Sequence, residues 1–282
     1  MTILPLVVAL LLTVACANHS SAAYEAGSGQ LTVFAAASLA NSFPEIADAF
    51  ESEHPGASIT FNFAGSQRLR TQLEFGAKAD VFASADQRQM DLAVAAGLIS
   101  GDSLPFAGNA LIVIAPLTSR ETDEERVQEL DDLARDGVTL ALAAPEVPAG
   151  TYSRELLRNL EANVEDLGPG YASRVLENVV THDPNVRSVL QKVALGEVDA
   201  GIVYRTDAET DYAAGKVELV SIPDGSNIVA EYPIAVLREA ADSELAKEFV
   251  RFVLGERSQT ILGSYGFESP VVVGLIPGPD KR

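Results

Sequence analysis

Apolar runs of strand length alternate with segments of helical periodicity along most of this chain. The runs contain few charged residues and many small or β-branched ones, which is typical of strands buried on both faces. Strands are therefore predicted at residues 31–37, 58–64, 80–85, 109–115, 139–144, 199–204, 217–222 and 232–237. Helices are predicted from Ser42, at 68–75, 87–96, 120–136 and 151–159, from about 183, and at 243–254 with a continuation to about 263. This alternation predicts an α/β fold with largely parallel sheets.

Several predicted strands run directly into the start of a helix, and these turns hold the candidate chemistry. The first strand is followed by Ser38 and then by Ser42, which has the spacing of a capping box with Glu45. The second strand passes through Gly65 and Ser66 into its helix. Such turns gather free backbone N–H groups at the positive end of a helix dipole, which favours the binding of an anion.

Later turns have the same character. Asp86 is the predicted N-cap of the helix at 87–96, and Asp183 followed by Pro184 has the N-cap and first-turn signature of another helix. Ligands of parallel α/β sheets bind beyond the carboxyl ends of the strands. The turns predicted to form a binding region are those at Ser38, Ser66, Ala149 and Val186.

Length and composition restrict the function further. At 282 residues the chain can form one large domain or two lobes, and 47% hydrophobic with 21% charged residues is typical of a globular protein. The formal net charge of −20 argues against nucleic acid as a partner. An anion would have to be held by local donors, because the overall field repels it. The single cysteine, Cys16, excludes an internal disulfide and a thiolate metal cluster.

The N-terminus has the pattern of an export signal. Residues 1–15 are uncharged, apolar and too short to span a bilayer comfortably, and a small, polar run follows them, so residues 1–29 are predicted to be signal peptide and tether. Residues 13–16, Thr-Val-Ala-Cys, resemble a bacterial lipobox, which implies lipidation of Cys16, although Leu is usual in place of Thr13 and an N-terminal Lys or Arg is missing. A plain signal peptide or an uncleaved anchor is the alternative. The predicted location is the periplasm, or the outer face of the cytoplasmic membrane as a lipoprotein.

Taken in order, the turn segments resemble the periplasmic molybdate-binding proteins of bacterial ABC importers. The matching segments are AAASL at 35–39, AGSQ at 64–67, GAKADVFASAD at 76–86, VPAGTY at 147–152, NVR at 185–187 and DAGIVY at 199–204. The resemblance covers residues 31–270 and implies the two-lobed, hinge-closing fold of type II periplasmic binding proteins, each lobe a mainly parallel sheet flanked by helices. Lobe 1 would contain residues 30–107 plus 228–282, and lobe 2 residues 108–227.

The resemblance also implies the site and its use. The family holds its oxyanion with two serines, two backbone N–H groups and a tyrosine hydroxyl. By matching segment, these fall on Ser38 and Ser66, on Ala149 and Val186, and on Tyr204. The implied function is capture of molybdate and tungstate by a monomer that delivers them to an ABC permease in the cytoplasmic membrane. No catalysis, cofactor or metal cation is implied.

These positions suit a fully deprotonated dianion. Molybdate, tungstate and sulfate only accept hydrogen bonds at neutral pH, and the five positions offer donors without a carboxylate. Phosphate keeps a proton near pH 7 and is expected to be rejected, because that proton would lack an acceptor. Sulfate could be excluded only by the size of the cavity. Arg68 and Arg187 lie beside the site turns, where the family pattern has no arginine, and are predicted to be surface or inter-lobe contacts.

Other interpretations stay open from the sequence. Each site serine could simply cap a helix or a turn, and Tyr204 could be a core aromatic residue. Binders of sulfate or ferric ion can share this fold, and a ferric site would cluster tyrosines; those available are Tyr152, Tyr171, Tyr204 and Tyr212. A serine hydrolase would need a Gly-x-Ser-x-Gly motif, which does not occur. A ligand-sensing regulator is disfavoured because the chain is acidic and has no helix-turn-helix region.

Overall fold

The computed structural model describes residues 29–117 and 126–270. The predicted signal segment and Cys16 lie outside the described residues. Within the described part of the chain, no helix is both long and apolar enough to cross a membrane.

The strands form one continuous mixed sheet in the order β2-β1-β3-β9-β4-β7-β5-β6, with β8 paired to β4. Their bounds are β1 Gln30–Ala36, β2 Ser58–Ala64, β3 Val81–Ala83, β4 Leu104–Pro116, β5 Leu140–Ala143, β6 Val179–Asp183, β7 Ala200–Tyr204, β8 Val217–Val220 and β9 Val229–Val236. Strand β1 is parallel to β2 and β3, and β5 is parallel to β6 and β7. Strands β4 and β9 run antiparallel to each other and to their other partners.

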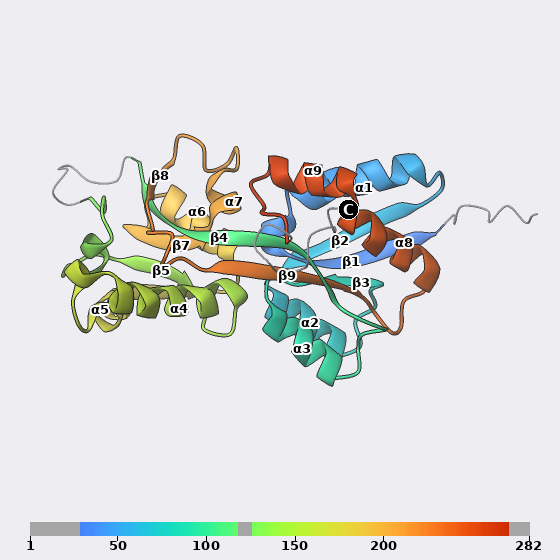
Figure 1. The fold of residues 1–282 in the computed structure, drawn as a ribbon, viewed down its shortest axis with the longest axis horizontal. Coiled ribbons are helices and arrows are strands. Elements are labelled where there is room, and N and C mark those ends of the chain that lie inside the picture. The colour runs from blue at the N-terminus through green and yellow to red at the C-terminus, as the bar shows by residue number, and fades with distance from the viewer. Residues whose placement is uncertain (1–28, 118–125, 271–282) are drawn as a thin grey trace, which may run out of the picture.

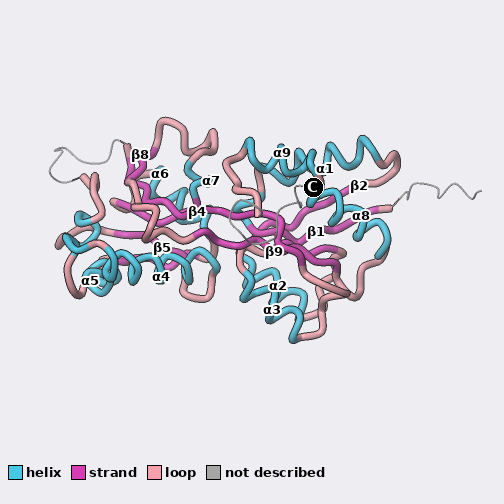
Figure 2. Tube along the Cα trace, in the orientation of Figure 1, coloured by secondary structure: helices cyan, strands magenta, loops and turns pink. Residues whose placement is uncertain are grey.

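The helices cover the faces of this sheet in two separate groups (Figures 1 and 2). Around β1, β2 and β3, the first half of the molecule carries α1 Ser42–Glu53, α2 Ser66–Glu74, α3 Gln87–Ala95, α8 Ser243–Leu254 and α9 Glu256–Ser264. Around β5 to β8, the second half carries α4 Pro148–Asn163, α5 Tyr171–Glu177, α6 Val186–Ala194 and α7 Arg205–Ala208. Short 3-10 helices lie at η1 Ala37–Leu39, η3 Asp131–Ala134 and η4 Glu165–Leu167.

Strand β4 connects the two halves. Its residues up to Ala110 pair with β9 in the first half, and from Leu111 onward it pairs with β7 and β8 in the second. One cluster of buried apolar side chains extends through both halves, from Phe43 and Phe249 to Val189 and Ile202. The α/β architecture predicted from the alternation of strands and helices is confirmed. The antiparallel central strands make the sheet more mixed than that alternation suggests.

Some local predictions were wrong. Ser42 is not a cap but the first residue of α1, and its hydroxyl donates to the Leu39 carbonyl at 3.4 Å. The N-cap of α6 is Asn185, which accepts a hydrogen bond from the Ser188 amide, whereas Asp183 ends β6 and pairs with Lys192 at 2.8 Å. Asp86 caps α3 as predicted, through the Gln89 amide.

The exposed helix predicted at 120–136 is also wrong where the structure describes it. Residues 126–136 contain only the short η3, and they bury Val127, Leu130 and Leu133 against the core. The many charged residues of this segment concealed the three apolar residues in the sequence pattern.

Candidate functional site

A small cavity of about 10 Å³, counted as the space open to the centre of a water-sized sphere, lies where the two halves meet. It is lined from the first half by residues Ala36, Ala37, Ser38, Gly65, Ser66 and Ala85, and from the second by Val147, Pro148, Ala149, Asn185, Val186 and Tyr204. All five residues that the sequence singled out are therefore brought to one place, although the chain separates the first from the last by more than half its length. None of the lining residues carries a charge of either sign.

The two serines come from corresponding turns at the ends of neighbouring parallel strands. Ser38 lies in η1, directly after β1, and Ser66 is the first residue of α2, directly after β2 and Gly65. Both side chains are buried. The Ser66 hydroxyl oxygen accepts the Ala85 amide at 3.0 Å, so its own hydrogen is left to be donated elsewhere. A Cβ at Gly65 would lie 2.5 Å from the Pro184 carbonyl oxygen of the other half, so this turn needs glycine to let the halves approach.

Two helix N-termini supply the backbone donors. Ala149 is the second residue of α4, behind Pro148, and Val186 is the first residue of α6, behind its N-cap Asn185. Amides at these positions have no partner within their own helix. Both residues line the same cavity, and free N–H groups and positive helix ends there favour a negative charge.

A glycine fixes how α4 approaches the sheet. A Cβ at Gly150 would lie 2.0 Å from the Ala144 carbonyl oxygen and 2.4 Å from that of Ala143. Only glycine lets the first turn of α4 pack this closely on the end of β5. The VPAGTY segment therefore has a physical reason for its glycine, beyond the two donors of its turn.

Tyr204 ends β7 and is almost completely buried, with 1% of its surface exposed. Its hydroxyl makes no hydrogen bond of normal geometry with any of the described residues, and the Tyr232 ring lies 5.7 Å away, edge to face. Burial, and then Tyr232, raise the pKa of Tyr204 well above its ordinary value, so the group stays a hydroxyl donor. A buried hydroxyl without a partner costs about 1–3 kcal/mol, and a hydrogen-bond acceptor bound in the cavity would offset that cost.

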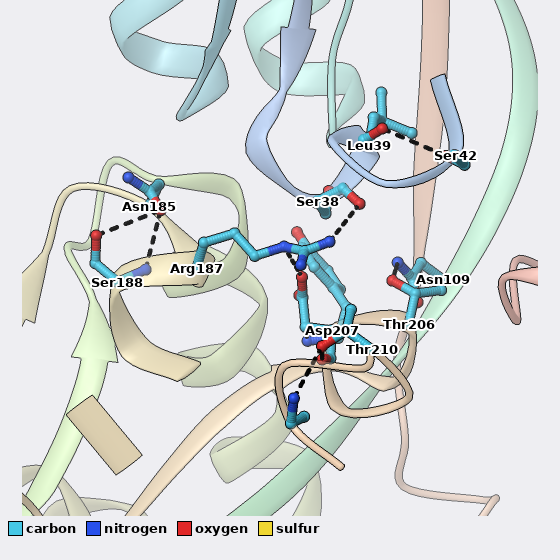
Figure 3. A network of polar contacts seen from close by, with 12 residues as sticks. Ser38, Leu39, Ser42, Asn109, Asn185, Arg187, Ser188, Thr206, Asp207 and Thr210 are labelled. Carbon is cyan, nitrogen blue, oxygen red and sulfur yellow. Dashed lines mark hydrogen bonds and ion pairs between the residues drawn. The ribbon is translucent and has the colours of Figure 1, made fainter. Parts of the chain in front are cut away.

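Arg187 connects the two halves beside the cavity (Figure 3). Its Nε lies 2.6 Å from Oδ1 of Asp207, and its Nη2 donates to the Ser38 carbonyl at 3.1 Å. Asp207 is fully buried, and its other carboxylate oxygen accepts the Tyr204 amide at 3.3 Å. The prediction of a surface or inter-lobe contact is right for both arginines, since Arg68 is exposed and Arg187 bridges the halves.

Asp207 was missed by reasoning from the sequence. Burial raises its pKa to about 6, and the nearby Arg187 guanidinium acts in the opposite direction. Its position three residues after Tyr204 is the spacing at which an acidic side chain takes part in a capping box, and α7 shows the half of that arrangement in which the Asp207 carboxylate accepts the Tyr204 amide. That spacing was the one available signal, and it does not reveal the contact with Arg187.

Two glutamines also join the halves. Gln67 donates through Nε2 to the Pro184 carbonyl at 3.0 Å, and Gln89 donates to the Glu146 carbonyl at 3.3 Å. With Arg187, these side chains hold the two halves together next to the cavity. All three donate to backbone carbonyls across the boundary between the halves.

A metal site is not supported in the part of the chain that the structure describes. No group of three or more His, Cys, Asp or Glu residues there could hold a metal ion. Of the four tyrosines considered for ferric ion, only Tyr204 lines the cavity. Tyr171 donates to the Leu130 carbonyl at 2.6 Å, and Tyr212 lies at the surface with Lys216 over its ring. The cavity therefore lacks the cluster of tyrosines that a ferric site would need.

Comparisons with known proteins agree with this arrangement. A sequence profile of bacterial extracellular solute-binding proteins matches residues 31–268. The molybdate-binding protein ModA of Mycobacterium tuberculosis is 38% identical over 261 residues, covering 91% of this chain and 93% of that protein. The substrate-binding domain of a putative molybdenum ABC transporter from Clostridium difficile has a TM-score of 0.61 at 27% identity, covering 85% of this chain and 98% of that one.

A likeness in fold alone extends to another anion binder. The sulfate-binding protein SubI of Mycobacterium tuberculosis has a TM-score of 0.75 at 20% identity, covering 89% of this chain and 92% of that one. The resemblance to molybdate-binding proteins predicted from the turn segments is confirmed by the relatives. The chain belongs to the family of bacterial extracellular solute-binding proteins.

Proposed function

We propose that this protein captures molybdate, and tungstate with it, and delivers the anion to an ABC importer without chemical turnover. The observation that carries the proposal is the wall of the cavity between the halves. It brings together two serine hydroxyls, two helix N-termini and an unpartnered tyrosine hydroxyl, with no charged side chain. Relatives named for molybdate support the choice of ligand.

The proposed ligands of the oxyanion are Ser38 Oγ, Ser66 Oγ, the backbone amides of Ala149 and Val186, and Tyr204 Oη. These groups are donors, and a fully deprotonated tetrahedral dianion only accepts hydrogen bonds. A carboxylate in the wall would repel such an anion, and none lines the cavity. Protonated phosphate would leave its hydrogen without an acceptor, a mismatch that can produce large discrimination.

Capture is proposed to occur by closure of two lobes, residues 30–107 plus 228–282 and residues 108–227. The change of partners along β4 between Ala110 and Leu111 supports a division close to this boundary, because the strand there leaves one group of helices and enters the other. Closure around the anion would replace its water shell with aligned dipoles. The closed form would be the one that a permease recognises.

A hydrolase remains unsupported by the geometry. Neither histidine of the described residues lines the cavity, so no base accompanies Ser38 or Ser66 there. Binding alone accounts for the arrangement.

Export and anchoring are proposed from the N-terminal sequence. We infer that residues 1–29 direct the chain out of the cytoplasm and that Cys16 carries lipid, which would keep the protein, as a monomer, near its permease. Mass spectrometry of the mature protein tests this: an N-terminal diacylglyceryl-cysteine at position 16 is expected. An unmodified N-terminus downstream of Cys16 would contradict the anchor but not the export.

The test of the function is isothermal titration of the chain from about residue 24 with molybdate, tungstate, sulfate and phosphate in separate experiments. Tight binding of the first two, no heat with phosphate and little or none with sulfate are expected. No detectable binding heat with any of the four anions would refute the oxyanion proposal. Binding of sulfate alone would leave the donor-only site standing and show that the substrate is wrong.

A further inference from the structure

Two buried residues outside the cavity wall form a hydrogen-bonded chain that ends on Ser38. Tyr232 of β9 places its hydroxyl 2.8 Å from Ser38 Oγ, although 194 positions separate the two residues. Asn109 of β4 donates through Nδ2 to the same tyrosine hydroxyl at 3.3 Å and to Thr206 Oγ1 at 2.8 Å. Tyr232 and Asn109 are completely buried, and Ser38 is 2% exposed.

We propose that Tyr232 and Asn109 are positioning residues that make the Ser38 hydroxyl a hydrogen-bond donor toward the bound anion. The proposal rests on the proposed function, because it assigns the direction of one bond in that site. Neither residue lines the cavity, so each acts through Ser38.

The direction of the chain follows from counting hydrogens. The Asn109 amide nitrogen has two hydrogens, and its two contacts use both of them. The tyrosine oxygen therefore accepts from Asn109, and its single hydrogen has Ser38 Oγ, 2.8 Å away, as its acceptor. If Ser38 donated instead, the buried Tyr232 hydrogen would have no acceptor among the hydrogen bonds of the described residues. Ser38 Oγ then accepts from Tyr232, and its own hydrogen is free to point into the cavity.

The reversed chain is less favourable. Turning the Asn109 amide over would let its oxygen accept from Tyr232 and Thr206, and Ser38 would then have to donate to Tyr232. That arrangement leaves two buried amide hydrogens without partners, whereas the observed one leaves a single unpartnered oxygen, Asn109 Oδ1. Orphaned buried N–H groups are rarer than under-satisfied carbonyl oxygens, which favours the observed orientation.

The consequence is selectivity. The Ser38 hydroxyl donates its hydrogen toward the cavity and accepts the Tyr232 hydrogen with one lone pair. It is therefore poorly placed to accept a hydrogen bond from a protonated oxyanion. A free serine could rotate and serve as either donor or acceptor. The chain thus extends the donor-only character of the site to a hydroxyl that could otherwise change roles.

A double-mutant cycle tests the proposal on the purified protein, with the molybdate Kd measured by titration calorimetry for Tyr232→Phe, Ser38→Ala and the double variant. Tyr232→Phe keeps the ring that packs on Phe106, Tyr204 and Phe267. We expect it to weaken molybdate binding about tenfold, since one oriented hydrogen bond is lost. In the Ser38→Ala background the same change should have almost no effect, because residues that act through one another are not additive.

Tyr171→Phe is the matched control. It also removes a buried hydroxyl, one that donates to the Leu130 carbonyl at 2.6 Å, far from Ser38 in the fold. It should lower the unfolding midpoint and leave the molybdate Kd unchanged.

Three results overturn the inference: an unchanged Kd in Tyr232→Phe, an equal loss in the wild-type and Ser38→Ala backgrounds, or an equal loss in Tyr171→Phe. Failure of the unmodified protein to bind any of the oxyanions would instead overturn the proposed function itself.

Discussion

Replacing Arg187 by methionine tests how the buried ion pair beside the cavity supports the fold. The change removes the cation from a carboxylate, that of Asp207, which has no exposed surface. The side chain of methionine keeps most of the apolar stem. Asp207 then remains as a buried carboxylate without a cation, and it can become neutral by taking up a proton.

The size of the effect follows from the pKa of Asp207, which is about 6 instead of the ordinary 3.8 because burial outweighs Arg187. Since the folded pKa is raised, the folded state favours the protonated acid, and that contribution to stability is lost as the pH rises through 6. Above this pKa, the folded protein prefers ionised Asp207, paired with Arg187, over protonated Asp207. The preference grows by a little over 1 kcal/mol for each pH unit above the pKa. That preference is the largest unfolding free energy that Arg187→Met can lose through this pair, because Asp207 can take up a proton once the cation is gone.

The loss of unfolding free energy from the pair is therefore expected to be near zero at pH 5, at most about 1 kcal/mol at pH 7 and at most about 3 kcal/mol at pH 8. The lost bond to the Ser38 carbonyl adds a pH-independent term of about 1 kcal/mol. Urea unfolding of the wild type and variant at these pH values measures both parts.

A matched control is Arg257→Met, which removes the exposed partner of Glu53. That surface pair should contribute less than about 1 kcal/mol, with little change over this pH range. A loss in Arg187→Met that is equal at pH 5 and pH 8, or greater at pH 5, would refute the reasoning.

Three further substitutions separate binding from stability. Tyr204→Phe removes the unpartnered hydroxyl, so the unfolding free energy of the ligand-free protein should rise by about 1 kcal/mol, as measured by thermal unfolding. Molybdate should bind about 1–3 kcal/mol more weakly by calorimetry, and an unchanged affinity would exclude this hydroxyl from the site. Ser38→Ala should weaken binding by about 1–3 kcal/mol, and an unchanged Kd would exclude it as a ligand. Gly150→Ala forces a Cβ to within 2.0 Å of the Ala144 carbonyl, so it should displace the start of α4 and weaken binding at least about tenfold. Gly263→Ala meets no atom within 4 Å and should leave the affinity unchanged, and equal losses in the two glycine variants would disprove this explanation.

Much of the strand pattern could be predicted because buried strands carry a local signal. The second strand, Ser58–Ala64, has the bounds expected from its apolar run. Strand β4 begins earlier than expected, at Leu104, because Pro105 and Gly108 interrupt the pattern and tertiary pairing with β9 overrides them. Strand β6 was missed because its residues, ending in His182 and Asp183, are too polar to be recognised as a buried strand.

The candidate site, too, was only partly predictable from the sequence. Ser38, Ser66 and Tyr204 lie at strand ends, where a local pattern and an ordered family resemblance can identify them. Their supporting residues lie far away in sequence: Asp207 meets Arg187 across two helices, and Tyr232 reaches Ser38 from β9. No local periodicity encodes such contacts, because they depend on how β4 and β9 bring the halves together.

The most direct test of the account is a crystal structure of the protein with tungstate, with the metal located by its anomalous scattering. The account predicts one strong anomalous peak in the cavity between the halves, with its oxygens within hydrogen-bond distance of Ser38, Ser66 and Tyr204 and of the amides of Ala149 and Val186. A peak elsewhere on the molecule, or an anion held in this cavity by other groups, would contradict it.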